Sequence, residues 1–345
     1  MRVLRVAIVG CGSASKGHFV AWKKVPHANI VAICDPDQNA LRYASKLWKI
    51  DHCFLSTSEL LDFKDVDVWD IITPPQYHAS VAIQAMKAGF NVLLEKPMTL
   101  TIEDAISLLE CQKSTGVVAG VIHNWLFEPP VLRARKIVEK GKIGEIVSVQ
   151  IDILHTKDEP MAANKNHWCH RLPGGRFSEM LAHPIYLLRY FLGDINVQAL
   201  EVRKSGGYPW MKYDELRATF ANRQRIGGAY VSFNSPRDAI FIDVFGKAGI
   251  LRLDVITGAM NLLPKAKMSR FQKGKDSIKQ AGQLLTSTLT NAFSILTKRW
   301  ITGLGMCIQL FAQSLRENKP PPVTLHEGFG VVKVQEEMIK MIENS

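Results

Sequence analysis

The chain has 345 residues, more than a single hydrophobic core usually organises, so its length predicts two domains. Its 47% hydrophobic and 22% charged residues are ordinary for a folded protein and exclude a chain that is disordered throughout. The formal net charge of +11 is unevenly spread, because the stretch from Lys265 to Trp300 holds eight Lys or Arg and one acid. Such a patch can attract nucleic acid, anionic lipid or a phosphorylated substrate.

Three features of the sequence bear on location. It has no run of 18 or more apolar residues that would span a bilayer, and its first short apolar run ends in Gly10-Cys11-Gly12 rather than at a cleavage site. Its six cysteines show no Cys-x-x-Cys pairing, which fits a reducing compartment. We therefore expect a cytoplasmic protein without a transmembrane segment.

Strands and helices alternate over the first 125 residues. The predicted strands are 3–9, 29–34, 68–73, 90–94 and 117–122, and the predicted helices are 15–25, 37–48, 77–87 and 101–114. This alternation is typical of a parallel, doubly wound sheet. We expect a dinucleotide-binding Rossmann domain over residues 1–124.

The pattern changes in the rest of the chain. Strands are predicted at 144–153, 197–204, 215–221, 226–234, 240–245 and 250–255, with a helix at 177–192. Short turns between most of these strands favour a large open, mostly antiparallel sheet. We expect a substrate and oligomerisation domain of the α+β class over residues 125–325, and a final helix, 326–345, that packs back on the first domain.

The first candidate site is Gly10-x-Gly12-x-x-Ser15, which follows the first strand. The glycines permit a tight turn in which backbone N–H groups approach a pyrophosphate, although Ser15 replaces the usual third glycine. Asp35 ends the second strand, where a carboxylate can bond both hydroxyls of an adenosine ribose and repel a 2′-phosphate. The pattern thus predicts NAD rather than NADP, with a strand–turn–helix that binds no ligand as the alternative.

Two further turns follow strands that end at the same sheet edge. Thr73-Pro74 leads to His78, which is either a cofactor contact or a buried histidine that orders the turn. Glu95-Lys96-Pro97 closes the apolar run 90–94, where Lys96 is a candidate catalytic residue and Glu95 is expected to orient the loop. The alternative for Lys96 is a surface lysine. The candidate cofactor contacts are Gly10, Gly12, Ser13, Ala14, Asp35, Thr73, Pro74, His78, Glu95 and Lys96.

A polar stripe on the helix predicted at 177–192 forms the next candidate site. Glu179 and His183 are spaced i, i+4 and therefore share one helix face, with Tyr186 near His183. A carboxylate can hold an acid/base histidine, so His183 and Glu179 are candidate catalytic residues. An exposed polar face is the alternative, and Pro184 makes it less favoured.

The segment His167-Trp168-Cys169-His170-Arg171 invites a metal hypothesis. It lacks a fourth ligand at a standard spacing, so we expect no metal and instead a pocket loop that contacts a polar substrate. The candidate substrate contacts are Lys96, Trp168, His170, Arg171 and Tyr186.

Apolar residues at 278, 281, 285, 289, 292, 296 and 300 mark an amphipathic helix. An interfacial membrane helix is one interpretation. A helix packed on the protein's own sheet or on a partner subunit is favoured over it, because the polar face is mostly Ser, Thr, Asn and Gln. The basic segment has few interleaved aromatic residues, so nucleic-acid binding is not expected.

These features together resemble the glucose–fructose oxidoreductase / inositol dehydrogenase (Gfo/Idh/MocA) family over nearly the whole chain. The motifs that carry the resemblance are Gly10-x-Gly12 with His18, Asp35-Pro36, Thr73-Pro74 with His78, Glu95-Lys96-Pro97, Gly174-Gly175 leading to His183, and Pro320-Pro321-Pro322-Val323. Glu-Lys-Pro in this context is quite specific.

The resemblance implies NAD(P)-dependent oxidation or reduction of a sugar, cyclitol or nucleotide-sugar hydroxyl by a homodimer or homotetramer. It implies that Lys96 and His183 handle the proton and that Asn124 lies near the nicotinamide. Glu179 and Tyr186 stand where many members have aspartates, which makes the particular substrate unsafe to transfer. A redox-neutral lyase or glycosidase and a non-catalytic NAD-binding sensor are the alternatives.

Overall fold

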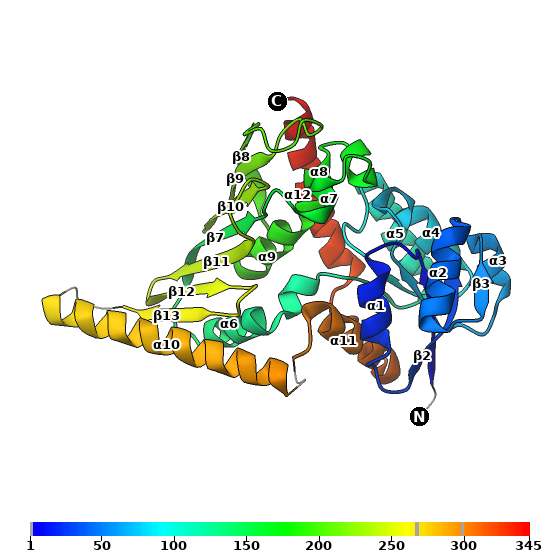
Figure 1. Ribbon diagram of the computed structural model, residues 1–345, viewed down its shortest axis with the longest axis horizontal. Helices are drawn as coiled ribbons and strands as arrows, with labels where there is room; N and C mark the ends of the chain where they lie inside the picture. Colours follow the sequence, from blue (N-terminus) through cyan, green and yellow to red (C-terminus); the bar gives the residue numbers. More distant parts are fainter. Residues whose placement is uncertain (1–2, 266–268, 298–299) are drawn as a thin grey trace. The chain divides into compact units, whose positions relative to one another are not determined.

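The computed structural model describes residues 3–265, 269–297 and 300–345 (Figure 1). The chain divides into two compact units. The first unit holds Met1–Asn124 and Gly303–Glu336, and the second holds Trp125–Thr302 and Glu337–Ser345. The division after Asn124 is where the sequence places it, but the residues just after 302, which the sequence assigns to the second domain, belong to the first unit.

The first unit is built on a six-stranded parallel sheet in the order β3-β2-β1-β4-β5-β6. Its elements are β1 (Leu4–Val9), α1 (Ser15–Trp22), β2 (Ala28–Cys34), α2 (Gln38–Trp48), β3 (His52–Phe54), α3 (Thr57–Asp62), β4 (Val68–Ile71), α4 (His78–Lys87), β5 (Asn91–Leu94), α5 (Ile102–Thr115), β6 (Ala119–Val121) and α11 (Gly303–Glu317). This strand order confirms the expected Rossmann domain, and such sheets bind ligands at the carboxyl ends of the strands, where the order reverses between β1 and β4.

Helix α11 completes the core of the first unit although it is far from the sheet in sequence. It packs against α1, and Ile308, Phe311 and Ala312 join the hydrophobic cluster around Phe19 and Trp22. The segment after α11 pairs beside β6, where the Val121 N–H donates to the carbonyl oxygen of Val323. An apolar face that would be exposed on the first 124 residues alone is therefore covered by this later helix.

The second unit is built on a seven-stranded sheet in the order β13-β12-β11-β7-β10-β9-β8, in which only β7 and β10 pair in parallel. Its strands are β7 (Ile146–Leu154), β8 (Asn196–Arg203), β9 (Glu215–Ala221), β10 (Ile226–Ser232), β11 (Ala239–Gly246), β12 (Gly249–Asp254) and β13 (Met260–Pro264). The expected mostly antiparallel sheet is confirmed, with β13 as a strand that the sequence patterns missed.

One face of this sheet is covered by a helix that the sequence predicted as continuous. The structure divides it into α8 (Arg176–Met180) and α9 (Ala182–Leu192), and α9 packs on β7 and β10. Pro184 has no N–H to donate to the carbonyl of Met180, which accounts for the break at Leu181. The remaining helices of this unit are α6 (Pro129–Glu139), α7 (Pro160–Ala163) and α10 (Arg270–Leu296), and α12 (Leu325–Glu343) begins in the first unit and ends in this one.

No helix in the described part of the chain is long and apolar enough to cross a membrane. The amphipathic helix expected near residue 278 is α10, which lies along β13 (Figure 1). The residues of the basic stretch at 266–268 and 298–299 lie outside the described residues.

The place of α11 in the first core predicts the effect of one substitution. Phe311 is fully buried, so Phe311→Ala should lower the free energy of unfolding by about 3–5 kcal/mol through lost contacts and a residual cavity. Chemical denaturation followed by circular dichroism measures this. Gln313→Ala on the exposed side of α11 is the control, and an equal, small effect of both changes would contradict the packing described.

Candidate active site

The glycine turn after β1 is shaped by close contact with the strand beside it. Gly10 has a φ of +103°, and a Cβ there would lie 2.8 Å from the carbonyl carbon and oxygen of Ile72. At Gly12, by contrast, no described atom lies within 4 Å of where a Cβ would be. The turn is therefore tight on the protein side and open on the other, as close approach of a phosphate to the backbone requires.

Ser15 takes the position of the usual third glycine without closing this turn. Its hydroxyl donates to the carbonyl oxygen of Gly12 at 2.7 Å, and the side chain is buried. Ala14 precedes α1 and provides no side-chain cap, so the N–H groups of Ser13 and Ala14 lie where an anion can bind the first turn of the helix.

Asp35 connects the end of β2 to the glycine turn. Its Oδ2 accepts from the Cys11 N–H at 2.7 Å, and its Oδ1 accepts from the Asp37 N–H at 2.8 Å. Each carboxylate oxygen has a second lone pair that a ribose hydroxyl can use. The half-buried Asp35 thus holds the turn in place and offers acceptors at the edge where the adenosine ribose is expected.

A buried polar atom at the neighbouring strand end also fits a dinucleotide. The Thr73 hydroxyl oxygen is buried and has no hydrogen-bond partner among the described residues. Pro74 follows it and precedes the short 3₁₀ helix η1 (Pro75–Tyr77). Together with the open side of Gly12 and the acceptors of Asp35, this orphaned hydroxyl supports an NAD site at the carboxyl edge of the first sheet.

His18 lies beneath this edge between two carboxylates. Its Nδ1 is 2.8 Å from Asp70 Oδ2 and its Nε2 is 3.1 Å from Glu95 Oε1. Trp22 Nε1 donates to the same oxygen of Asp70 at 2.7 Å. Burial alone would lower the pKa of His18, but the two carboxylates outweigh burial and raise that pKa to about 10. His18 is therefore an imidazolium that ties α1 to β4 and to the turn after β5.

The Glu95 carboxylate connects His18 to Lys96. Its Oε1 contacts His18, and its Oε2 accepts from the backbone N–H of Lys96 at 2.8 Å. The peptide between Lys96 and Pro97 is cis, and the Lys96 side chain is half-buried. Lys96, the lysine predicted as catalytic, therefore lies in a turn whose backbone is fixed by a hydrogen bond to the Glu95 carboxylate.

His78 bridges the turn after β4 and the turn after β5. Its Nδ1 is 2.9 Å from the carbonyl oxygen of Pro97, and its Nε2 is 2.7 Å from that of Thr73. The ring is almost fully buried, and this burial lowers its pKa. Both nitrogens face backbone carbonyls, so the structure favours the histidine that orders the turn over the direct cofactor contact.

The second unit presents His183 from the first turn of α9. Its Nδ1 is 2.7 Å from the hydroxyl oxygen of Tyr186, which also accepts from the Trp125 N–H at 3.2 Å. The Trp125 ring stacks on the imidazole with a centroid distance of 3.9 Å. The ring plane and its Nδ1 edge are therefore held by Tyr186 and Trp125, so proton transfer to a substrate would have to use Nε2.

Glu179 belongs to a buried ion cluster in α8. It accepts from Arg176, whose guanidinium also pairs with Glu159 through Nε at 3.3 Å. Burial would lower the pKa of Arg176, but the two carboxylates raise it. The sequence gives no local signal for the ion pair between Arg176 and Glu159, because the two residues are 17 positions apart. The predicted orienting role of Glu179 toward His183 stays a prediction.

The loop with Trp168, His170 and Arg171 forms the short helix η3 (Trp168–Arg171). His170 Nε2 lies 3.0 Å from the carbonyl oxygen of Met161, Trp168 is half-buried and Arg171 is exposed. Cys169 is fully buried, and burial raises its thiol pKa to about 12. Within the described ranges, no three His, Cys, Asp or Glu side chains come together as metal ligands would.

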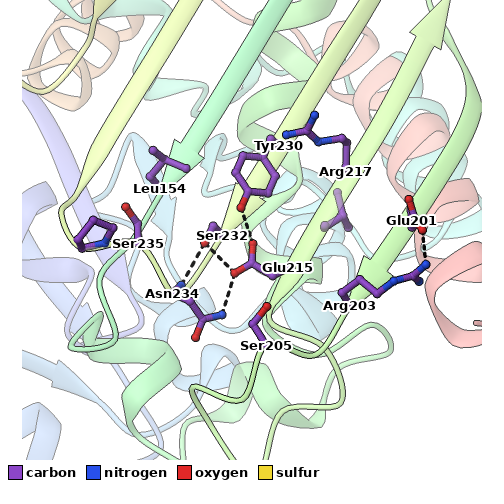
Figure 2. Close-up of a pocket in the computed structure, with 12 residues that line it drawn as sticks. Leu154, Glu201, Arg203, Ser205, Glu215, Arg217, Tyr230, Ser232, Asn234 and Ser235 are labelled. Carbon is purple, nitrogen blue, oxygen red and sulfur yellow. Dashed lines mark hydrogen bonds and ion pairs between the residues drawn. The ribbon is translucent and has the colours of Figure 1, made fainter.

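A wide cavity of the second unit lies away from His183. It has a volume of about 720 Å³ on the face of β9 and β10, lined by Glu215, Tyr230, Ser232 and Asn234 (Figure 2). Glu215 accepts from all three of the other side chains, at 2.7 to 2.9 Å. The Glu215 carboxylate is thus hydrogen-bonded by neighbouring side chains of the same sheet face. His183 does not line this cavity.

The fold and the site define a two-unit protein with a dinucleotide-binding Rossmann unit. Among sequence models of protein families, the one described as the oxidoreductase family with an NAD-binding Rossmann fold matches residues 4–123, and the GFO/IDH/MocA C-terminal domain matches residues 131–252. The chain belongs to the GFO/IDH/MocA oxidoreductase family. This confirms the family expected from the motifs.

Two curated relatives are named sugar dehydrogenases. The D-apiose dehydrogenase of Paraburkholderia graminis is 31% identical over 138 residues, which are 40% of this chain and 37% of the relative. The levoglucosan dehydrogenase of Pseudarthrobacter phenanthrenivorans is 26% identical over 208 residues, or 57% of this chain and 53% of the relative. The chain therefore spans about half or less of the length of these two relatives.

The fold is shared with solved structures over nearly its whole length. The WlbA dehydrogenase from Bordetella pertussis, crystallised with NADH and UDP-GlcNAcA, has a TM-score of 0.81 and 22% identity, and the match covers 99% of this chain and 96% of that one. At this identity the likeness shows the fold.

The position of Asp35 predicts a loss of cofactor affinity on its removal. Asp35→Ala removes the acceptor for Cys11 and for the ribose, so NAD should bind at least about tenfold more weakly. Isothermal titration with NAD and NADP measures this, and NADP binding should weaken less. Asp51→Ala, an exposed aspartate of the same unit, is the control, and unchanged NAD affinity of the Asp35 variant would refute the site.

The buried imidazolium predicts how stability depends on pH. The pKa of His18 rises on folding from 6.5 to about 10, so its ion pairs stabilise the native state fully below pH 6.5 and progressively less as pH rises toward 10. The difference in free energy of unfolding between the wild type and His18→Gln should therefore shrink over this window. Urea unfolding at several pH values measures it, and a constant difference would mean that His18 is neutral.

Proposed function

We propose that the protein is an NAD-dependent oxidoreductase that transfers a hydride between the nicotinamide and a carbohydrate-type hydroxyl or ketone. The observation that carries this proposal is the pairing, at one sheet edge, of the glycine turn anchored by Asp35 with the Lys96 turn anchored by Glu95 and His18. The names of the relatives support a sugar as the substrate class.

The residues that would hold the cofactor are those of the first unit. Backbone N–H groups at Gly12, Ser13 and Ala14 would face the pyrophosphate, Asp35 the ribose, and Thr73 and Asn124 the nicotinamide end. NAD, when bound, supplies the hydride acceptor. These roles rest on the position of each residue along the carboxyl edge and on the resemblance.

The proton of the substrate hydroxyl is assigned to Lys96 and His183. As the carbon–hydrogen bond loses its hydride, the hydroxyl loses a proton, and the family resemblance gives Lys96 and His183 as the residues that accept and exchange it. Tyr186 and Trp125 position the imidazole, while the ion pair of Arg176 and Glu179 stabilises α8, the short helix that precedes the one carrying His183. Trp168, His170 and Arg171 are the proposed contacts for the polar groups of the sugar.

The proposed location is the cytoplasm, and the proposed assembly is a homodimer or homotetramer. All six cysteines are free and five are buried, which supports a reducing compartment. The face of the seven-stranded sheet that carries the cavity of Figure 2 also exposes Phe241 and Ile226, at 36% and 62% of their surface. A second copy of this face is the proposed partner.

The assembly predicts a change in mass on a single substitution. Phe241→Glu should shift the protein toward a smaller species, because a carboxylate would be buried without a partner in the interface. Size-exclusion chromatography with light scattering measures the mass. Ile106→Glu in the first unit is the control, and a monomeric wild type would contradict the proposed oligomer.

The catalytic assignment predicts separate effects on turnover and on binding. Lys96→Met and His183→Gln should each lower kcat by about 100- to 10,000-fold, the range of general acid–base catalysis. NAD affinity of the His183 variant should stay unchanged, because that residue belongs to the second unit. A screen of sugars and nucleotide sugars followed by NADH absorbance supplies the substrate.

Native mass spectrometry of the purified protein, followed by NAD and NADP titration, tests the proposal directly. Exchangeable NAD supports an ordinary dehydrogenase. NAD that stays bound through purification, with turnover that produces no net NADH, would indicate a redox-neutral lyase or glycosidase instead. Binding of neither nucleotide would refute an oxidoreductase.

A further inference from the structure

Helix α10 exposes its apolar side. Ile278, Leu285, Leu289, Phe293 and Leu296 follow one another at helical spacing along one stripe, and they are 76%, 62%, 61%, 60% and 81% exposed. A surface helix ordinarily turns its apolar stripe toward the core and its polar face toward water. In α10 the two faces are reversed.

The polar face of α10 is the one that packs on the protein. The Gln283 side chain accepts from the Leu262 N–H at 2.7 Å and donates to the Leu262 carbonyl at 3.1 Å, as an added strand would. Asn291 is buried, accepts from Arg133 at 3.2 Å and donates to the Thr257 carbonyl at 3.1 Å. These bonds to β13 and its neighbouring turn fix the rotation of the helix, so the apolar stripe cannot turn inward without losing them.

The apolar stripe is therefore exposed because the polar face of α10 is bonded to the protein. Exposed apolar surface is unfavourable in free energy in water. A continuous exposed apolar patch of this kind marks an interaction surface. The helix has 27 residues, which corresponds to a length of about 40 Å. The occupant of this surface must accept an apolar ridge that runs along a single straight helix.

Lysines cluster around the first half of α10. A cavity of about 570 Å³ lies between α10 and the strands β12 and β13, and four of its lining side chains are Lys247, Lys265, Lys273 and Lys279. Asp276 is the one acid in that lining, and Lys247 pairs with Glu145. The cavity thus favours anionic groups on the side of α10 that faces these strands, along the half of the helix where the apolar stripe begins.

These two features together select one occupant. A second copy of α10 would complement the ridge but would offer the lysines no acid other than Asp276, the one acid of this helix. An anionic bilayer supplies both an apolar acyl region and phosphate headgroups at its surface. We propose that α10 is an interfacial membrane helix, which lies in the surface of an anionic bilayer with its leucine and phenylalanine side chains among the acyl chains and the lysines against lipid phosphates.

Vesicle flotation of the full-length protein tests this proposal. The protein should float with vesicles of phosphatidylcholine and phosphatidylglycerol, should stay in solution with phosphatidylcholine alone, and should release as salt rises. Leu285→Glu combined with Leu289→Glu should weaken binding to the anionic vesicles at least about tenfold, because two leucines that would enter the acyl region are replaced by carboxylates. Lys273→Glu combined with Lys279→Glu should do the same. Ile106→Glu, in the other unit, should bind like the wild type.

A second measurement keeps the test independent of these charged variants. Phe293→Trp adds a fluorophore on the stripe, and the difference in emission between this variant and the wild type, which share the seven native tryptophans, should shift to the blue with anionic vesicles. Binding of NADH, which involves the other unit, should be unchanged in all α10 variants and reports that they are folded.

Three outcomes would overturn the proposal. In the first, the wild type does not float with anionic vesicles at low salt. In the second, the lysine variant loses binding while the leucine variant and the Phe293→Trp emission do not respond, which would show adsorption without insertion. In the third, the leucine variant halves the mass in light scattering while the wild type stays in solution with vesicles, which would assign the stripe to a second copy of the chain.

Discussion

A buried histidine between two carboxylates is the interaction on which the first unit's site depends. His18 from α1, Asp70 from β4 and Glu95 from the turn after β5 come from three separate elements and meet where His18 and Asp70 are buried and Glu95 is partly buried. Either carboxylate alone beside a neutral ring would be an uncompensated buried charge. The positively charged ring therefore joins the helix that begins at the glycine turn to the loop that carries Lys96. The glycine turn and the Lys96 loop are thus both fixed through the protonated His18.

The second unit holds its own acid/base candidate by a different principle. His183 is kept in place by an aromatic stack with Trp125 and by the Tyr186 hydroxyl, which are neutral groups. The charges are set one helix earlier, where Arg176 lies between Glu159 and Glu179. The two histidines are thus held in different ways: ion pairs with two carboxylates fix His18, whereas a ring stack and a hydroxyl orient His183.

Local patterns were sufficient to predict the parallel sheet, the glycine turn, Asp35 and the Lys96 turn, because each depends on residues adjacent in sequence. Contacts between distant segments were not predictable in this way. Asp70 was visible as an acid inside an apolar strand, but nothing local indicated that His18, 52 residues earlier, neutralises it. Similarly, the spacing of α10 marked its two faces, yet it could not tell which face would pack on β13, because Gln283 pairs with Leu262, 21 residues earlier. The place of α11 in the first unit was not predictable for the same reason, since its partners lie near residue 20.

The anchoring of the glycine turn by Asp35 has a consequence for redox chemistry. Cys11 stands between the two glycines, and burial together with the Asp35 carboxylate raises the pKa of its thiol to about 12. Oxidants and electrophiles react with the thiolate, which is scarce at such a pKa. A cysteine beside the expected pyrophosphate would otherwise be a natural point of oxidative inactivation. Burial, together with the carboxylate that orders the turn, thereby makes Cys11 unreactive toward oxidants at the cofactor edge.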